Sequence, residues 1–202
     1  MNATDTRNRI LMTAMELFWE KGYGSTSIAD ILSRSQIHSG SLYHFFPGKQ
    51  DVLVGVLEMY RDGIEEMLFA PNWQGVDDPI DRIFALLAGY RTHLIVTDCT
   101  YGCPIGSLAL EIHEPDPVVR ELMAANFTNW SAAIAGCFDA AGDRLPRETD
   151  RAALGEFVLT VMEGAVMQAR TYRDIGYFDR NIAVLQDYIT ALLVSAKRDS
   201  FA

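Results

Sequence analysis

The spacing of apolar residues is the feature that most constrains the fold of this chain. Between residues 4 and 21 they recur at intervals of three and four, as at Ile10, Ala14 and Leu17, which places them on one helical face. Similar spacing returns in the later segments. No segment shows the alternation of apolar and polar residues that is typical of a half-buried strand. These patterns predict an all-α protein of about nine helices.

Caps and prolines set the expected boundaries of these helices. The run Ser25-Thr26-Ser27 offers cap oxygens to a second, short helix, and Pro79, Pro104 and Pro117 stand near the first positions of later ones. The helices expected cover about residues 4–21, 28–35, 39–45, 49–68, 79–94, 104–112, 117–141, 150–173 and 179–197, with a loop at residues 72–75.

Length and composition indicate a soluble globular protein. The chain has 202 residues, 49% of them hydrophobic and 22% charged, which argues against disorder and fits one domain or two sharing a core. It has no run of eighteen apolar residues and no apolar signal segment at its start, so we expect no membrane span. Three cysteines without an export signal suit a reducing compartment. We therefore expect a cytoplasmic protein.

Charge is distributed unevenly along the chain. The formal net charge is −10, which by itself does not suggest binding to nucleic acid. Residues 1–50, however, carry five basic and four acidic side chains, whereas residues 51–202 carry twelve basic and twenty-three acidic ones. An acidic body repels a phosphate backbone, so any contact with DNA must come from residues 1–50, which we call the head.

The head contains the ingredients of a helix-turn-helix. Two short helices joined by a polar turn follow a longer first helix. In the second short helix Leu42 and the two following phenylalanines can face the core, which leaves Ser39, Gly40, Tyr43 and His44 on the opposite face. Hydroxyl, phenol and imidazole groups on one exposed face suit contacts with phosphates and base edges in a major groove.

Three further residues of the head are placed for phosphate contacts. Thr26 and Ser27 stand at the start of a helix, where the helix dipole favours an anion. Their hydroxyls and backbone N–H groups can bond to a phosphate there. Lys49 opens the next helix beside them. The candidate DNA contacts are Thr26, Ser27, Ser39, Gly40, Ser41, Tyr43, His44 and Lys49.

Spaced motifs of the head resemble the TetR family of bacterial transcriptional repressors. They are Phe18-(x)3-Gly22-Tyr23, Thr26-Ser27-Ile28-(x)2-Ile31 and the run from Gly40 to Lys49, and together they span about residues 7–55. The resemblance implies a homodimer whose third helices read a palindromic DNA operator, and a C-terminal region with a ligand pocket and a dimer interface. It implies DNA-binding roles for Thr26, Ser39, Gly40, Tyr43, His44 and Lys49. It also implies a DNA-binding domain over residues 1–48 and a ligand-binding and dimerisation domain over residues 49–202.

The head departs from the family pattern at two places. Ser39 stands where many members have lysine, and residues 35–38 read Ser-Gln-Ile-His where Ala-Gly-Val-Ser is common. These differences affect the expected operator sequence and affinity rather than the expected DNA-binding role.

The body offers candidates for an effector site. The segment of residues 101–108, Tyr-Gly-Cys-Pro-Ile-Gly-Ser-Leu, resembles one subgroup of the family whose members respond to drugs, flavonoids or reactive electrophiles. Aromatic and sulfur-containing side chains at helical spacing can line a pocket for an aromatic or lipophilic effector, or can simply be core. The candidates are Tyr90, His93, Cys103, Asn126, Phe127, Trp130 and Met162.

Three other interpretations of the body stay open. Cys99 and Cys103 could sense electrophiles or redox state if a thiol is exposed and its pKa is lowered, but their spacing with His93 or His113 matches no strong metal site. Acidic residues and a histidine around Pro115 carry groups used in acid–base catalysis, yet no nucleophile motif or cofactor-binding fingerprint accompanies them. We expect neither an enzyme nor a cofactor. A helical interaction module without DNA binding is the alternative from a different class.

The last two expected helices favour dimerisation. They combine apolar residues with small ones such as Gly155, Gly164 and Ala191, which permit close contact between helices. Two such helices from each of two subunits would form a four-helix interface, although a bundle within one chain is also possible.

Overall fold

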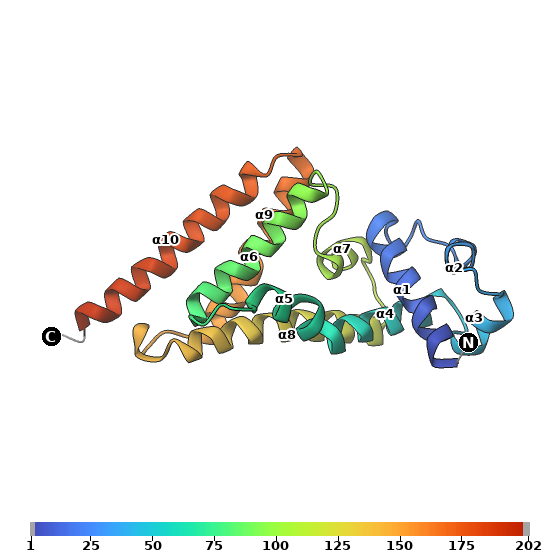
Figure 1. The fold of residues 1–202 in the computed structure, drawn as a ribbon, viewed down its shortest axis with the longest axis horizontal. Coiled ribbons are helices and arrows are strands. Elements are labelled where there is room, and N and C mark those ends of the chain that lie inside the picture. Colours follow the sequence, from blue (N-terminus) through green and yellow to red (C-terminus); the bar gives the residue numbers. More distant parts are fainter. Residues whose placement is uncertain (1–2, 200–202) are drawn as a thin grey trace. The chain divides into compact units, whose positions relative to one another are not determined.

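The described part of the chain, residues 3–199 of a computed structural model, consists of helices and connecting turns without a β-strand (Figure 1). The all-α prediction is confirmed. The α-helices are α1 (Ala3–Lys21), α2 (Ile28–Ser35), α3 (Ser39–Phe45), α4 (Lys49–Ile64), α5 (Ala70–Trp73), α6 (Pro79–Val96), α7 (Pro104–Glu111), α8 (Pro117–Ala140), α9 (Arg151–Tyr172) and α10 (Gly176–Asp199). A π-helical turn, η1 (Glu65–Phe69), and a 3-10 turn, η2 (Gly142–Arg144), complete the list.

Nine of these helices correspond to the predicted ones, and the region after α4 differs. Helix α4 passes through the π turn into α5, so Asn72 and Trp73 are helical where a loop was expected. A π turn holds one residue more than an α turn, and this shifts the buried face by one position. Phe69 is fully buried and stacks on Trp73 at 4.7 Å, whereas Leu68, which the predicted stripe contained, is only half-buried. The last helix also begins three residues earlier than the expected start at residue 179.

Side-chain caps explain several helix starts. The Ser27 hydroxyl accepts a hydrogen bond from the Asp30 N–H at 3.1 Å, and the Asp30 carboxylate accepts one from the Ser27 N–H at 2.8 Å. This reciprocal capping box satisfies two N–H groups that the helix cannot pair internally. Asp78 caps α6 and Asp150 caps α9 in the same general way.

The helices form two compact units. The first contains the described residues up to Gly63 together with Cys103–Asn126, that is, α1 to nearly the end of α4, α7 and the start of α8. Within it α1 packs against α2, α3 and α7. Its buried apolar side chains are Ile10, Leu11, Ala14, Leu17, Phe18, Ile31, Leu42, Phe46, Val52, Leu53, Val56 and Leu57, among others.

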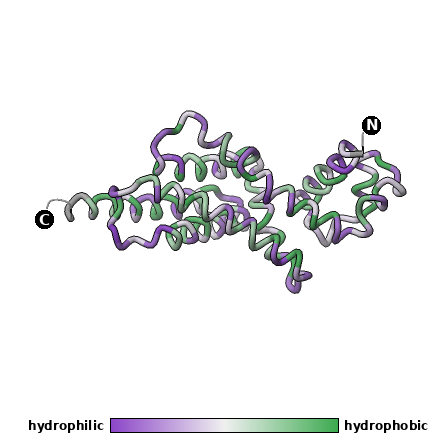
Figure 2. Tube along the Cα trace, turned by 90° about the horizontal axis from the view of Figure 1, so that it is seen from below, coloured by the Kyte–Doolittle hydropathy of each residue, from purple (hydrophilic) through white to green (hydrophobic). Residues whose placement is uncertain are grey.

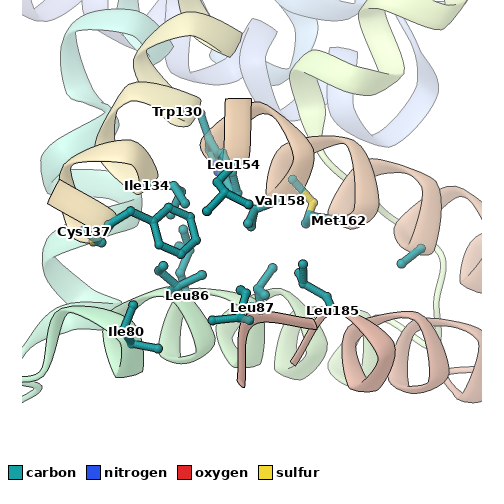
Figure 3. Close-up of a cluster of buried hydrophobic side chains, with 14 of the residues drawn as sticks. Ile80, Leu86, Leu87, Trp130, Ile134, Cys137, Leu154, Val158, Met162 and Leu185 are labelled. Atoms are coloured by element: carbon teal, nitrogen blue, oxygen red, sulfur yellow. The ribbon is translucent and has the colours of Figure 1, made fainter. Parts of the chain in front are cut away.

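The second unit contains Ile64–Gly102 and the described residues from Phe127 on. Helix α9 packs extensively against α10, and α6 packs against α5, α9 and α10. Figure 3 shows the interior of this unit, where Leu86 and Leu87 of α6, Ile134 of α8 and Val158 of α9 meet. Hydrophobic and hydrophilic stretches alternate along the chain trace of both units (Figure 2), as expected for helices with one buried face.

Helix α9 is long and apolar enough, by length and composition, to cross a membrane. Val158, Met162 and Ala169 are buried in the core of the second unit, so α9 also meets the description of a core helix of a folded domain. A single helix of this kind is weak evidence for a membrane span.

The compact units and the predicted functional domains are different divisions of the chain. The units follow contacts, and the first recruits α7 from far along the sequence. The division into a DNA-binding domain, residues 1–48, and a ligand-binding and dimerisation domain, residues 49–202, concerns function and stays a prediction. Its outermost residues, 1–2 and 200–202, lie outside the described residues.

Candidate nucleic-acid interface

Helices α2 and α3 are held by the core of the first unit and joined by a three-residue turn. Gln36 ends α2 in a left-handed conformation, with φ 53°, and its carbonyl oxygen accepts a hydrogen bond from Arg9 at 3.2 Å. Ile31 of α2, Leu42 of α3 and Phe46 after it are buried. Buried anchors on both helices fix which faces remain outside.

The outer face of α3 presents the polar residues that the sequence predicted. Ser39, Gly40, Tyr43 and His44 are exposed, and the Tyr43 side chain is 53% exposed despite its size. Apart from its chain neighbours and the nearby backbone of α3, nothing lies within 4 Å of the position that a Cβ at Gly40 would take, so a second molecule can approach the backbone closely there. Ser41 is half-buried beside them. This face combines donors, acceptors and an aromatic ring, which is the chemistry that reads phosphates and base edges.

Ser27 lies at the surface, at the start of α2, but its polar groups are engaged. Its hydroxyl donates to the Asp30 carboxylate at 2.6 Å, and its N–H donates to the same group. These bonds, the side-chain one first, hold the pKa of Asp30 below its usual value. A phosphate at this helix start would therefore have to share the site with a carboxylate.

Thr26 has a structural role in place of the phosphate contact expected from its position. It is 1% exposed, and its hydroxyl donates to the carbonyl oxygens of Gly22 at 2.8 Å and Leu17 at 3.2 Å. Its N–H donates to the Tyr23 carbonyl oxygen at 3.2 Å. Both polar groups are thus directed into the protein, because Thr26 ties the end of α1 to the start of α2.

Lys49 is at the first position of α4, as predicted, and its ammonium also faces the protein. The Nζ atom donates to the carbonyl oxygens of Tyr23 at 2.9 Å and Thr26 at 3.0 Å. It lies 4.2 Å from the centre of the Tyr23 ring, within the range of a cation–π contact. Lys49 thus holds the turn between α1 and α2, which we call the α1–α2 turn and define as residues 22–26.

Glu111 is a residue of this unit whose role the sequence did not reveal. Its carboxylate accepts hydrogen bonds from the N–H groups of Tyr23 at 2.9 Å and Gly24 at 2.6 Å. The sequence placed Glu111 only in an acidic cluster near Pro115. Two glycines around one tyrosine were the one local sign that something approaches the turn closely.

Five of the seven effector candidates belong to the second unit. Among them, Trp130 and Tyr90 contact each other directly, since the indole N–H donates to the Tyr90 hydroxyl at 3.2 Å. Met162 is fully buried in the core, next to Val158 of the same helix (Figure 3). His93 and Phe127 are half-buried, and burial lowers the pKa of His93, which favours a neutral imidazole.

The other two effector candidates, Cys103 and Asn126, belong to the first unit. The buried Asn126 amide donates to the carbonyl oxygens of Leu57 at 3.0 Å and Leu122 at 2.9 Å, so it fastens α8 to α4. Cys103 is the residue before α7 and is buried. For Asn126 the observed bonds indicate a packing role.

The cysteines and acidic residues do not assemble a metal site in the described residues, where no group of three or more potential ligands occurs. Cys99, Cys103 and Cys137 are buried and form no disulfide with one another. Burial, with the nearby Asp98 carboxylate, raises the pKa of Cys99, and burial raises that of Cys137. A raised pKa keeps a thiol protonated and unreactive.

Two short helices at a tight turn, with buried anchors inside and a polar, aromatic outer face on the second helix, define a helix-turn-helix DNA-binding protein. Comparisons with known proteins agree. Residues 10–56 match the profile of bacterial regulatory proteins of the tetR family, and residues 79–183 match that of the LmrA/YxaF-like transcriptional regulator C-terminal domain. The chain belongs to the TetR family of transcriptional regulators.

Individual relatives support this assignment over most of the chain. An HTH-type transcriptional regulator of Mycobacterium tuberculosis is 29% identical over 95% of this chain and 98% of its own length. The regulator YxaF of Bacillus subtilis is 29% identical over 84% of this chain and 87% of its own. A TetR transcriptional regulator from Chloroflexus aurantiacus has a similar solved structure, with a TM-score of 0.80, 27% identity and coverage of 93% and 96%. These relatives are regulators, the class expected here in place of an enzyme.

Proposed function

We propose that this regulator is a cytoplasmic repressor that binds a palindromic operator as a homodimer and is released by a small lipophilic or aromatic effector. The observation that carries the DNA-binding part is the outer face of α3, where Tyr43 and His44 are exposed beside Gly40 while Leu42 is buried. This exposed face has the chemistry of groove recognition.

Release by an effector requires a change in the distance between the two recognition helices of the dimer. Two recognition helices of a dimer reach successive major grooves when they are separated by about 34–36 Å. An effector that binds the body better in another arrangement moves α4 and changes this separation. A coupling of about 1–3 kcal/mol changes operator affinity roughly 5- to 150-fold.

The chemistry of the second unit supports an aromatic or lipophilic effector. Trp130 and Tyr90 supply ring surface and a hydroxyl that accepts a hydrogen bond from the indole N–H. His93, half-buried with a lowered pKa, adds a neutral polar group. The resemblance of residues 101–108 to the subgroup that responds to drugs, flavonoids or electrophiles points to the same class of effector.

The proposed dimer uses α9 and α10. Several large apolar side chains of these helices remain at the surface of the chain, including Phe157 at 45%, Val184 at 69% and Tyr188 at 47% exposure. Phe157 and Tyr188 contact each other edge to face at 5.9 Å, which joins the two helices into one apolar surface. A second subunit would remove this surface from water.

Sensing by a reactive cysteine is the alternative mechanism for the same regulator, and the structure offers it little support. A reactive thiol is exposed and has a lowered pKa. Cys99 and Cys103 are both buried, and burial raises the pKa of Cys99. A non-covalent effector is therefore the mechanism that we propose.

The test is a gel shift at fixed salt with the DNA immediately upstream of the gene for this protein. It compares the wild type with Tyr43→Ala and with Val118→Ala, a control that truncates an exposed side chain of α8 in the same unit. The proposal predicts a shift for the wild type and the control and none for Tyr43→Ala. If the wild type binds neither this DNA nor any site in a genome-wide selection, the protein is a helical interaction module instead.

A further inference from the structure

A carboxylate from α7 holds the α1–α2 turn of the DNA-binding head. Both Glu111 oxygens take part, because Oε2 accepts from the Tyr23 N–H at 2.9 Å and Oε1 from the Gly24 N–H at 2.6 Å. Glu111 lies 88 positions after Tyr23 and 87 positions after Gly24 in the sequence. Charge-assisted bonds of this kind are stronger than bonds between neutral groups.

The glycines of the turn leave room for this contact. Gly22 has φ +85°, and a Cβ at this residue would lie 2.8 Å from Glu111 Oε2. A Cβ at Gly24 would lie 3.0 Å from Oε1. A side chain at either position would crowd the carboxylate, so Gly-Tyr-Gly does more than end α1.

The position of Glu111 in its own helix is unfavourable. It is the last residue of α7, where the partial negative charge of the helix dipole repels a carboxylate, and the last turn carries no basic residue. An acidic residue at this end breaks a local rule of helix design. Such exceptions are expected where a side chain makes its main contact with a different part of the fold. Here the Glu111 carboxylate binds the α1–α2 turn.

The turn is bound from a second element with the opposite charge. The Lys49 ammonium of α4 donates hydrogen bonds to the carbonyl oxygens of Tyr23 and Thr26. The Glu111 carboxylate accepts hydrogen bonds from the N–H groups of Tyr23 and Gly24. A cation on the carbonyls and an anion on the amides fix the orientation of the peptide groups. This turn leads directly into Ser27 and α2, on which the placement of α3 depends.

We propose that Glu111 is a positioning residue for DNA binding: through its carboxylate, α7 sets the conformation of the α1–α2 turn and thereby the affinity of the α2–α3 face for the operator. This inference rests on the proposed function. It gives α7, which follows directly on the buried Cys103, an influence on the head that is separate from any movement of α4.

The proposal is tested by whether operator affinity rises or falls when the charge of Glu111 is removed. In an acidic protein, loss of one negative charge should leave DNA affinity unchanged or raise it slightly. Glu114→Gln removes an exposed carboxylate three residues away that makes no hydrogen bond or ion pair among the described residues, and it serves as the matched control. Glu111→Gln removes the same charge and places an amide NH2 against a backbone N–H. We expect it to lower operator affinity about tenfold, because a charge-assisted contact is lost.

The measurements are operator affinity at several salt concentrations and amide hydrogen exchange of Tyr23 and Gly24 in the full-length protein without DNA. In Glu111→Gln the two amides should exchange at least about tenfold faster, with an unchanged salt slope and a circular dichroism spectrum like that of the wild type. Glu114→Gln should match the wild type in exchange.

Two outcomes separate this inference from the proposed function. If the wild type binds its operator and Glu111→Gln binds equally well or better although its turn amides exchange faster, Glu111 does not position the DNA-binding face. If the wild type itself binds no DNA, the proposed function is wrong, whatever the exchange data show for the turn.

Discussion

The Lys49 ammonium lies 4.2 Å from the centre of the Tyr23 ring and donates a hydrogen bond to the carbonyl oxygen of the same residue at 2.9 Å. The first residue of α4 is thereby bound to the α1–α2 turn, 26 positions earlier in the chain. The sequence predicted that the Lys49 ammonium contacts a DNA phosphate. In the structure it binds the α1–α2 turn and so helps to hold the head together. We therefore expect Lys49 to support DNA binding through the structure of the head rather than through direct contact.

Lys49→Met should weaken operator binding without changing its salt dependence. Methionine keeps much of the apolar stem but cannot bond to the carbonyl oxygens of Tyr23 and Thr26, so the turn loosens. We expect affinity to fall roughly 5- to 10-fold, which corresponds to about 1–1.4 kcal/mol. Fluorescence anisotropy across a salt series measures both quantities. If the magnitude of the slope of log affinity against log salt is smaller by about one in Lys49→Met than in the wild type, Lys49 contacts a phosphate instead.

Thr26→Val should destabilise the first unit. The substitution keeps the shape of a fully buried side chain and removes the hydroxyl that bonds to Gly22 and Leu17. Carbonyl oxygens deprived of a partner raise the free energy of the folded state by about 1–3 kcal/mol. Urea unfolding measures the loss. Thr26→Ser, which retains the hydroxyl, should lose less; equal losses for both variants would show that the methyl group matters more than the bonds.

Gly155→Ala should destabilise the second unit although alanine is the better helix former. An added Cβ would clash with the Ser131 carbonyl oxygen and lie 3.1 Å from the Ala135 N, both in the backbone of α8, so α8 and α9 would have to separate. We expect a loss of about 1–3 kcal/mol. Gly136→Ala is the control, since nothing lies within 4 Å of its Cβ position, and it should gain about 0.5–1 kcal/mol. Thermal unfolding that moved both variants upward would contradict the close helix contact.

The Asp78–Arg144 ion pair should make stability depend on pH in the acid range. The hydrogen bond from Arg144 is the main cause that lowers the pKa of Asp78 below its usual value. A carboxyl group with a lowered folded-state pKa stabilises the fold at neutral pH, and this contribution disappears as the pH falls through that pKa. Asp78→Asn, which can still cap α6, should therefore melt below the wild type at pH 7 and approach it below about pH 4.

Asp81→Asn is the control for that experiment, because Asp81 lies in the same helical turn with an exposed side chain. Its melting temperature should follow the wild type more closely at neutral pH. Parallel acid profiles for the wild type and Asp78→Asn would show that the ion pair contributes no measurable stability, as is common for exposed pairs.

The sequence predicted those features whose causes lie within a few residues. The boundaries of α3 at Ser39 and Phe45 and the cap at Ser27 follow from nearby side chains and a proline. The burial of Leu42 opposite an exposed Tyr43 follows from helical periodicity. The π turn after α4 and the helical Asn72 were missed, because the register change brings Phe69 into a core that only the folded chain contains.

By itself the sequence determined an all-α protein, a capped helix-turn-helix and the face of α3 that remains exposed. These depend on spacing and caps, which act over one or two helical turns. Only the tertiary structure decided that Thr26 is buried, that Lys49 faces the protein, and that Glu111 joins α7 to the head. These outcomes depend on packing, which brings backbone groups from other parts of the chain within hydrogen-bond distance of these side chains. No local sequence pattern contains that information.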